Sequence, residues 1–224
     1  MRLLQILAAM VGCGWVLVAS ATAQMPDALV LDGETVELHT NPLERYFDRH
    51  PERRPKSSII SSGLWRGYRA TFAVMRGRLY VRKVEIMTTV GIGRDDRWKN
   101  VVAETVEPGA RFASFYSGAL IIPRGELVEY VHMGYASTYE RYTVLSVKEG
   151  VVTARHDLTR VQFEEFRRRQ FERFRASPAY APLLKETMRE LSDGPDRQAL
   201  AEQFLFEFYQ EQYLAALPEE RARP

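Results

Sequence analysis

The strongest strand signals in the chain lie in residues 117–157, SGALIIPRGELVEYVHMGYASTYERYTVLSVKEGVVTARHD. Two turn sequences interrupt the apolar and alternating runs there, Pro123-Arg124-Gly125 and Lys148-Glu149-Gly150. They predict tight connections between strands, because their residue types suit turn backbone angles. The strands expected around them cover residues 112–122, 127–133, 141–147 and 151–155. Such short links favour antiparallel pairing, since a parallel pair needs a long crossover.

The residues before this stretch predict more sheet. Asp32-Gly33 separates two short β-type runs, 28–31 and 35–38, and Asp-Gly in that position is a strong hairpin signal. Between residues 64 and 86, alternating apolar residues predict two further strands that turn at Arg76-Gly77. The whole chain is therefore expected to form about eight strands.

The residues after this stretch predict helices. Thr159 is a suitable N-cap for a helix over residues 160–175, in which Phe163, Phe166 and Phe174 fall on one face. A second helix is expected after Ser177-Pro178. The third is expected after Asp196, and its apolar residues are Leu200, Phe204 and Phe208, widened by Leu205, Tyr209 and Tyr213.

This order of elements predicts an α+β fold: an antiparallel β-meander sheet or open barrel of about eight strands, with three C-terminal helices packed on it. We expect one domain over residues 24–217, with a β-rich part at 24–157 and a helical part at 158–217, and a frayed tail at 218–224. The alternative is a β-domain followed by a separate helical domain. One domain is favoured, because the aromatic residues of the helices need an apolar partner surface.

The first 23 residues predict a secretory signal peptide. A basic start at Arg2 precedes an apolar run, which ends in Ala21-Thr22-Ala23, a pattern that signal peptidase accepts. We expect cleavage after Ala23 and a periplasmic or secreted protein; the alternative is an uncleaved N-terminal membrane anchor. Cys13 is the only cysteine, so the chain has no internal disulfide.

Charge and histidine spacing argue against several functions. The formal charge is +2, and loss of Arg2 with residues 1–23 leaves about +1, which does not suit a nucleic-acid-binding protein. The four histidines are scattered and lack the spacing of paired metal ligands; they are His39, His50, His132 and His156. We therefore expect no metal site and no cofactor.

The loop over residues 132–140 is the first candidate site. It begins with His132, ends with Glu140 and contains Tyr135 and Tyr139. Loops on a rigid sheet often carry binding residues, and His132 and Glu140 would suit proton transfer if the hairpin brought them together. In the alternative interpretation, His132 is a hydrogen-bonded residue at a strand end and Glu140 a solvated acid.

A second cluster, Trp65-Arg66-Gly67-Tyr68-Arg69, combines aromatic and guanidinium side chains. Such side chains can bind sugars or carboxylates by stacking and by bidentate hydrogen bonds. In the alternative interpretation, Tyr68 packs in the core, a helix covers Trp65, and the arginines are solvated. We expect this cluster to face the 132–140 loop across the sheet.

Three sequence runs resemble a family of small bacterial proteins of unknown function. They are WRGY at 65–68, GRLYV at 77–81 and PRGELVEYVHMGY at 123–135, and the resemblance covers about residues 28–155. It implies a β-rich fold and no particular activity.

These observations favour a non-catalytic exported protein that binds a cell-envelope ligand or a protein partner. A second hypothesis is an envelope hydrolase in which His132 and Glu140 act as acid and base and Arg66 orients an anionic group. A third is a peripheral membrane protein that uses the helix at 160–175, which contains six arginines and three glutamates. Packing of that helix on the sheet is the simpler explanation for its phenylalanines.

Overall fold

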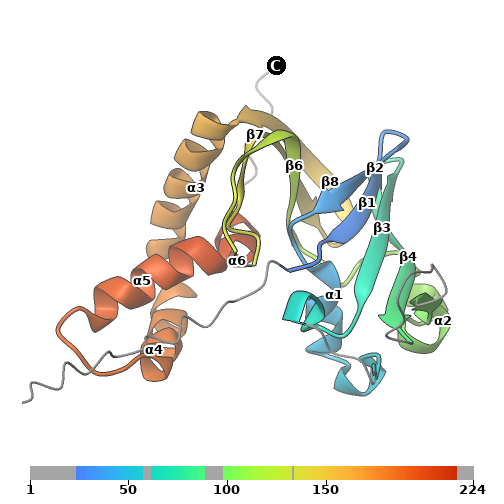
Figure 1. The fold of residues 1–224 in the computed structure, drawn as a ribbon, viewed down its shortest axis with the longest axis horizontal. Helices are drawn as coiled ribbons and strands as arrows, with labels where there is room; N and C mark the ends of the chain where they lie inside the picture. The colour runs from blue at the N-terminus through green and yellow to red at the C-terminus, as the bar shows by residue number, and fades with distance from the viewer. Residues whose placement is uncertain (1–23, 58–61, 89–97, 133, 216–224) are drawn as a thin grey trace, which may run out of the picture.

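The computed structural model describes residues 24–57, 62–88, 98–132 and 134–215 (Figure 1). The predicted signal peptide and the predicted frayed tail at 218–224 lie outside these residues. In Figure 1, strands β1 to β4 with the short helices lie on one side of the molecule and helices α3 to α6 on the other, with β6, β7 and β8 between them.

The strands form one eight-stranded sheet, in the order β2-β1-β3-β4-β8-β7-β6, with β5 paired to β4. Their bounds are Asp27–Leu31 (β1), Glu34–Leu38 (β2), Arg69–Met75 (β3), Arg78–Met87 (β4), Trp98–Asn100 (β5), Gly118–Glu129 (β6), Thr138–Lys148 (β7) and Val151–Thr159 (β8). All pairs are antiparallel except β1 with β3. The predicted α+β fold with a mostly antiparallel sheet is confirmed.

The parallel pair departs from a simple meander. After β2, residues 39–68 run back before β3 joins the free edge of β1. They include helix α1 (Pro42–Phe47) and the 3₁₀ turns η1 (Pro51–Arg53) and η2 (Ser62–Leu64). This length of chain is what parallel pairing requires.

Three of the four predicted tight turns form. The turn predicted at 123–125 is wrong: β6 runs through it from Gly118 to Glu129, with a bulge between Arg124 and Leu127. Asp32-Gly33, Arg76-Gly77 and Glu149-Gly150 all have positive φ at both residues, the conformation whose twist suits a two-residue hairpin. At Gly150 (φ +79°), a Cβ atom would also lie 2.8 Å from the backbone of Ala113. Only glycine fits this position without displacing its neighbour.

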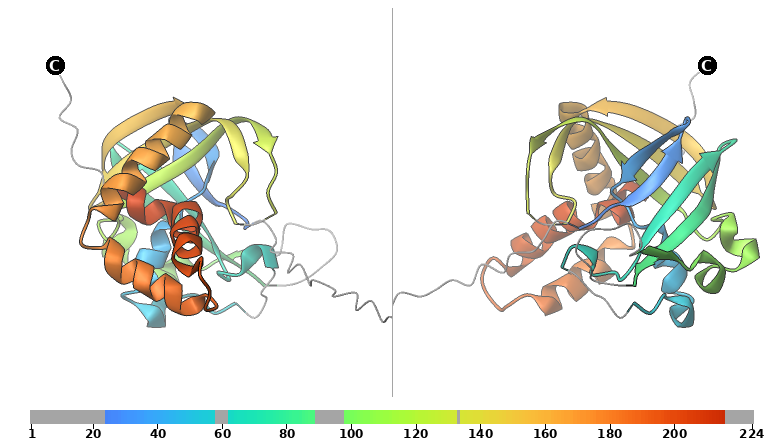
Figure 2. Two further views of the ribbon diagram at one scale, coloured as in Figure 1. Left: turned by 90° about the vertical axis from the view of Figure 1, so that its left-hand side faces the viewer. Right: turned by 45° about the vertical axis from the view of Figure 1, so that its right-hand side comes forward.

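The sheet curls until its first and last strands meet (Figure 2). At that point the His39 amide, just after β2, donates a hydrogen bond to the Ile121 carbonyl of β6 at 2.8 Å. Alternate residues of β6 then serve two cores: Leu120 and Ile122 face the interior of the curl, whereas Ala119 and Ile121 face the helices. Side chains point to opposite faces along a strand, so one strand can join both layers.

Helices form the second layer and a few short connections. Their bounds are Val102–Thr105 (α2), Arg160–Arg175 (α3), Tyr180–Glu190 (α4), Arg197–Phe208 (α5) and Gln210–Ala215 (α6), with a 3₁₀ turn at Pro108–Arg111 (η4). Helix α3 begins with the capping box that Thr159 predicts: Thr159 Oγ1 accepts from the Gln162 amide at 3.3 Å, and Gln162 Oε1 accepts from the Thr159 amide at 2.9 Å. The third predicted helix is two helices, α5 and α6, separated at Tyr209.

The buried faces of the helices agree with the phenylalanine pattern in α3 and differ from expectation in α5. Phe163, Phe166 and Phe174 of α3 are buried against the outer face of β6 and β7. In α5, Leu205 is buried, whereas Leu200, Phe204 and Phe208 form an exposed stripe. Among the described residues, no helix is both long and apolar enough to cross a membrane.

Candidate ligand-binding site

A pocket of about 280 Å³ lies between the curled sheet and the helical layer. We call it the interlayer pocket. Its wall comes from three parts of the chain: the segments around Gln24, Asn41 and Trp65 on the sheet side, residues 134–138 after β6, and helices α3, α5 and α6. None of these parts is adjacent in sequence to the others, so the tertiary fold creates the pocket.

Gln24 fixes the first described residues against this pocket. Its amide N–H donates to the Gly134 carbonyl at 3.2 Å, and its side-chain Nε2 donates to the Gly63 carbonyl at 2.8 Å. The residue is 6% exposed, and its Oε1 has no hydrogen-bond partner among the described residues. A buried acceptor without a partner costs stability, so this oxygen is a position where a ligand donor would be favourable.

Arg66 lies beneath the pocket wall and is inaccessible to solvent. Its guanidinium, like the Asp27 carboxylate that it contacts at 3.1 Å, has 0% side-chain exposure. It also donates to the Met25 carbonyl at 3.1 Å and approaches the Tyr135 hydroxyl at 3.5 Å. The predicted ligand contact is thus replaced by an internal ion pair that holds the N-terminal segment under the loop.

The pKa values of Asp27 and Arg66 are shifted in one direction by burial and in the other by the charge of the partner. Burial raises the pKa of Asp27, while the Arg66 charge and a hydrogen bond from the Ala70 amide, at 2.8 Å, lower it. Burial alone would lower the pKa of Arg66, but the Asp27 charge and hydrogen bond, together with the nearby Tyr135 and Tyr68, outweigh burial and raise it. Each charge therefore depends on the other for its stability in the interior.

The rest of the predicted Trp65–Arg69 cluster divides between the pocket, the core and another face. Trp65 is 60% exposed and lines the pocket. Tyr68 is buried and donates to Glu44 Oε1 at 2.6 Å, and burial raises its pKa well above the usual value. Arg69 pairs with Glu85 at 3.2 Å and lies 4.1 Å from the centre of the Trp98 ring, away from the pocket.

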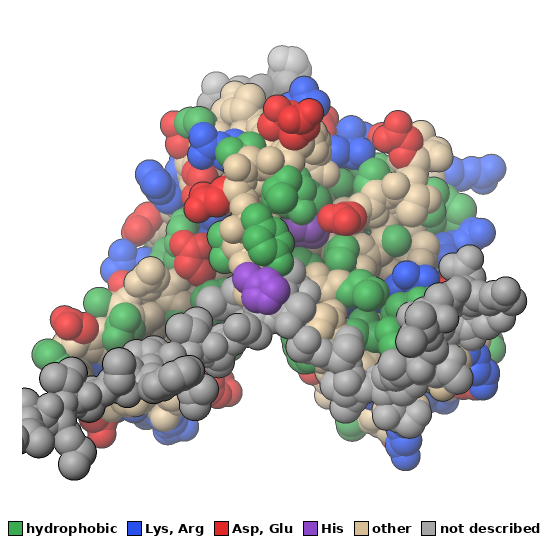
Figure 3. All heavy atoms as spheres, viewed as in Figure 1, with side chains coloured by type: hydrophobic (Ala, Val, Ile, Leu, Met, Phe, Trp, Pro, Cys, Tyr) green, Lys and Arg blue, Asp and Glu red, His purple; other side chains and the backbone are tan. Residues whose placement is uncertain are grey.

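The loop after β6 belongs to a long hairpin, residues 124–140, which we call the β6–β7 arm. Figure 3 shows hydrophobic side chains gathered along the middle of this face of the molecule, beside a histidine. Tyr135 stacks on the His39 ring at 4.7 Å and donates to Asn41 Oδ1 at 3.0 Å. Tyr139 meets the same His39 ring edge-on at 5.5 Å. These contacts join the arm to the end of β2.

Arg66 and Trp65 therefore meet the 134–138 part of the arm, as expected from the sequence. His132 and Glu140 do not meet in the same way. Strand β6 ends at Glu129, so His132 lies in the loop, where its Nδ1 is 2.7 Å from the Tyr130 hydroxyl. Glu140 Oε2 accepts from the Glu126 amide at 3.1 Å.

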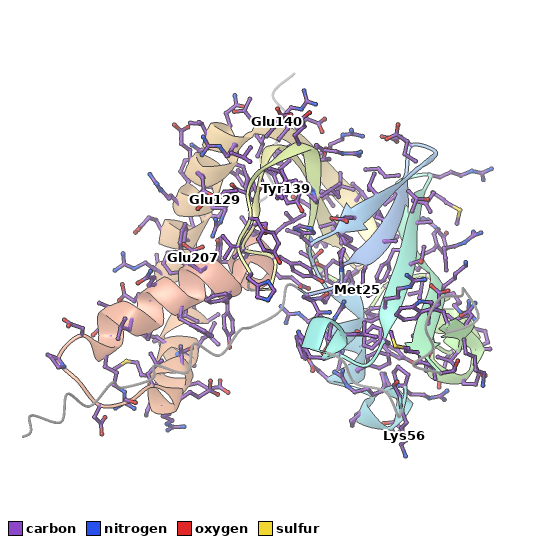
Figure 4. The ribbon with its side chains drawn as sticks, in the orientation of Figure 1. Met25, Lys56, Glu129, Tyr139, Glu140 and Glu207 are labelled. Atoms are coloured by element: carbon purple, nitrogen blue, oxygen red, sulfur yellow. The ribbon has the colours of Figure 1, made fainter. Side chains whose placement is uncertain are left out.

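Figure 4 shows Glu140 at the upper end of the arm, above Tyr139. No hydrogen bond or ion pair joins His132 to Glu140 in the part of the chain that the structure describes. Glu140 lies beside the bulge after Arg124, whereas His132 lies beyond the end of β6. Neither residue lines the interlayer pocket. The structure thus gives no proton-transfer pair at these two positions.

Arg167 of α3 is buried, so it does not belong to a basic outer face of this helix. Its guanidinium is bound by Glu164 at 2.9 Å, Glu207 at 3.1 Å and the Tyr213 hydroxyl at 3.1 Å. Arg167 follows Phe163 by four positions, about one helical turn, so it lies on the phenylalanine face of α3. This spacing could have predicted the burial of Arg167, but three consecutive arginines at 167–169 suggest an exposed basic segment.

Glu211 of α6 closes the pocket on the helical side. Its Oε2 accepts from the Asn41 amide at 3.2 Å. Burial raises the pKa of Glu211, partly offset by the Asn41 N–H and the nearby Arg45 charge. Sequence reasoning missed Gln24, Asn41, Glu207 and Glu211, because each becomes part of a site only through contacts between distant segments.

The residues described for the site do not indicate a metal centre, and no known protein indicates a function. Within the described ranges, no three His, Cys, Asp or Glu residues are grouped as metal ligands. The chain matches no protein-family model, no curated protein and no solved structure, so the resemblance to a β-rich bacterial family stays a prediction and the function must be inferred from the pocket.

Proposed function

We propose that this chain is an exported, non-catalytic protein that binds a cell-envelope ligand in the interlayer pocket. The observation that carries the proposal is the buried Gln24 Oε1 at the wall of a pocket with aromatic residues, which finds no partner in the part of the chain that the structure describes. Ligand sites typically combine an apolar concave surface with a few polar groups that orient the ligand. The interlayer pocket has this composition.

Trp65 supports a binding role from the mouth of the pocket. A large aromatic side chain that is 60% exposed is a poor contributor to the fold, and it supplies a flat surface for stacking. Export agrees with the predicted signal peptide at residues 1–23. The two arginines nearest the pocket already have ion-pair partners, Asp27 for Arg66 and Glu164 and Glu207 for Arg167, so their charges stabilise the walls.

The test compares Trp65→Ala with Tyr130→Ala. Tyr130 is a matched control, because it is 59% exposed on the β6–β7 arm and does not line the pocket. The mature protein would be incubated with a small-molecule extract of bacterial envelope, washed and analysed by native mass spectrometry. Loss of a stacking aromatic is expected to weaken binding about tenfold, which corresponds to about 1.4 kcal/mol.

We expect the wild type and Tyr130→Ala to retain the same small molecule and Trp65→Ala to lose it. Circular dichroism would establish that both variants are folded. Equal retention by the two variants, or no retained compound in the wild type, would contradict the proposed function.

A further inference from the structure

The charged groups in the wall of the interlayer pocket are mainly acidic. Among the described residues, three carboxylates (Glu164, Glu207 and Glu211) and one guanidinium (Arg167) line it. Arg167 is already bound by Glu164 and Glu207 at 2.9 and 3.1 Å. Glu211 accepts a backbone hydrogen bond from Asn41 and forms no ion pair with the described part of the chain. The Arg45 charge acts on Glu211 without forming an ion pair with it, so one carboxyl group of the wall has no direct cationic contact among the described residues.

The unpartnered polar atoms of the pocket provide a second, independent observation. Gln24 is more than nine-tenths buried, and its Nε2 is already used in hydrogen bonds to the Met25 and Gly63 carbonyls. Within the described ranges its Oε1 has no partner, and neither does the buried Oγ1 of Thr138, which also lines the pocket. A side-chain amide oxygen can only accept hydrogen bonds. A ligand group that satisfies it must be a donor.

The aromatic residues of the pocket favour the same kind of ligand. Trp65, on the sheet side, and Phe208, on the helical side, are both exposed and line the pocket, as does Tyr135 in the 134–138 segment. The π-face of an aromatic ring attracts a positive charge, most strongly for tryptophan. Phe208 belongs to the exposed stripe on α5, so one residue of that stripe is available for contact with a ligand.

We infer that the ligand carries a positively charged amine, which donates hydrogen bonds to the Gln24 oxygen and the Glu211 carboxylate while its carbon chain lies against Trp65 and Phe208. This inference rests on the proposed function and specifies its ligand class. An ammonium group has three N–H donors and no acceptor, which matches a wall of acceptors. An anionic ligand would meet three carboxylates, and Arg66 is too deeply buried to compensate for them.

Calorimetric titration at low salt can test the ligand class with defined probes. Spermidine represents the amines, N-acetylglucosamine the neutral polyols and succinate the anions. The informative variant is Glu211→Gln, because an amide oxygen can still accept from the Asn41 N–H while the charge is removed. The matched control is Glu104→Gln in α2, an exposed acid away from the pocket.

We expect spermidine to bind the wild type and Glu104→Gln equally, and Glu211→Gln at least tenfold more weakly. Because Glu211 is deep in the fold, thermal unfolding of each variant is measured first. If Glu211→Gln is unfolded, Trp65→Ala replaces it, with the same tenfold loss expected. Equal spermidine affinity in the pocket variant and the control would indicate general attraction to acidic surface and overturn the inference.

The ligand class and the proposed function can fail separately. If N-acetylglucosamine or succinate binds, Trp65→Ala weakens that binding and spermidine does not bind, the amine class is wrong and the pocket remains a binding site. If the envelope compound is retained equally by Trp65→Ala and Tyr130→Ala, the proposed function fails whatever the amine result.

Discussion

At the scale of residues, the ion pair between Asp27 and Arg66 is the most consequential contact beneath the pocket. It lies under Tyr135 and holds Met25 through a backbone hydrogen bond. Removing one partner of a buried pair leaves the other charge without compensation in the interior. An exposed pair costs far less to break, because water solvates the charge that remains.

We therefore expect Asp27→Asn to lower the free energy of unfolding by about 3–5 kcal/mol. Asp32→Asn is the matched control, since Asp32 pairs with Arg155 at the surface and its loss should cost less than about 1 kcal/mol. Urea unfolding at neutral pH measures both. Similar losses in the two variants would contradict the structural role assigned to Arg66.

Residue types alone identified part of the candidate site. Aromatic residues in loops indicate binding, which predicts Trp65 and Tyr135 as site residues, and both line the pocket. Arg66 has the same apparent chemistry but is buried, because its partner Asp27 is 39 residues away in sequence. Exposure depends on such distant partners, so it could not be predicted from the cluster itself.

At the scale of elements, local signals predict three hairpin turns and the start of α3 correctly, but not the bulge that replaces a turn at 123–125. A positive φ at Asp32-Gly33 or a capping box at Thr159 depends on a few adjacent residues. The parallel pairing of β1 with β3 and the break between α5 and α6 depend on the packing of remote segments. Periodicity also predicted the apolar residues of α5 without indicating which of two faces would be buried.

The two faces of α5 provide a direct comparison. We expect Leu205→Ala, at a fully buried position, to lower the free energy of unfolding by about 2–5 kcal/mol, because it leaves a cavity in the core of the helical layer. Leu200→Ala, at a position that is 54% exposed, should change it by less than about 0.5 kcal/mol. Thermal or urea unfolding distinguishes the two. The reverse order would mean that α5 packs through its other face.

At the scale of the whole molecule, the sheet and the helices share strands β6 and β7, whose two faces belong to two cores. The arm of this hairpin also reaches the end of β2 through Tyr135 and Tyr139. Layers that share strands should lose their structure together. The predicted single domain over residues 24–217 can be tested on this basis.

We expect the mature chain to unfold in one transition. Its two tryptophans, Trp65 and Trp98, are both in the β-rich part, so their fluorescence reports on that part, while far-ultraviolet circular dichroism reports mainly on the helices. Urea titrations followed by the two signals should have the same midpoint. Two separate midpoints would favour a β-domain with an independent helical domain.

The most direct test of the binding site is a nuclear magnetic resonance titration of the ¹⁵N-labelled mature protein with spermidine. The interlayer pocket predicts shifts of the Trp65 indole, the Gln24 side-chain amide and the backbone amides of residues 134–138. The Trp98 indole, which lies under Arg69 on another face, should stay in place and serves as the internal control. Shifts centred on Trp98, or on the exposed tip of the arm around Tyr130, with Trp65 and Gln24 unchanged, would contradict the pocket as the ligand site.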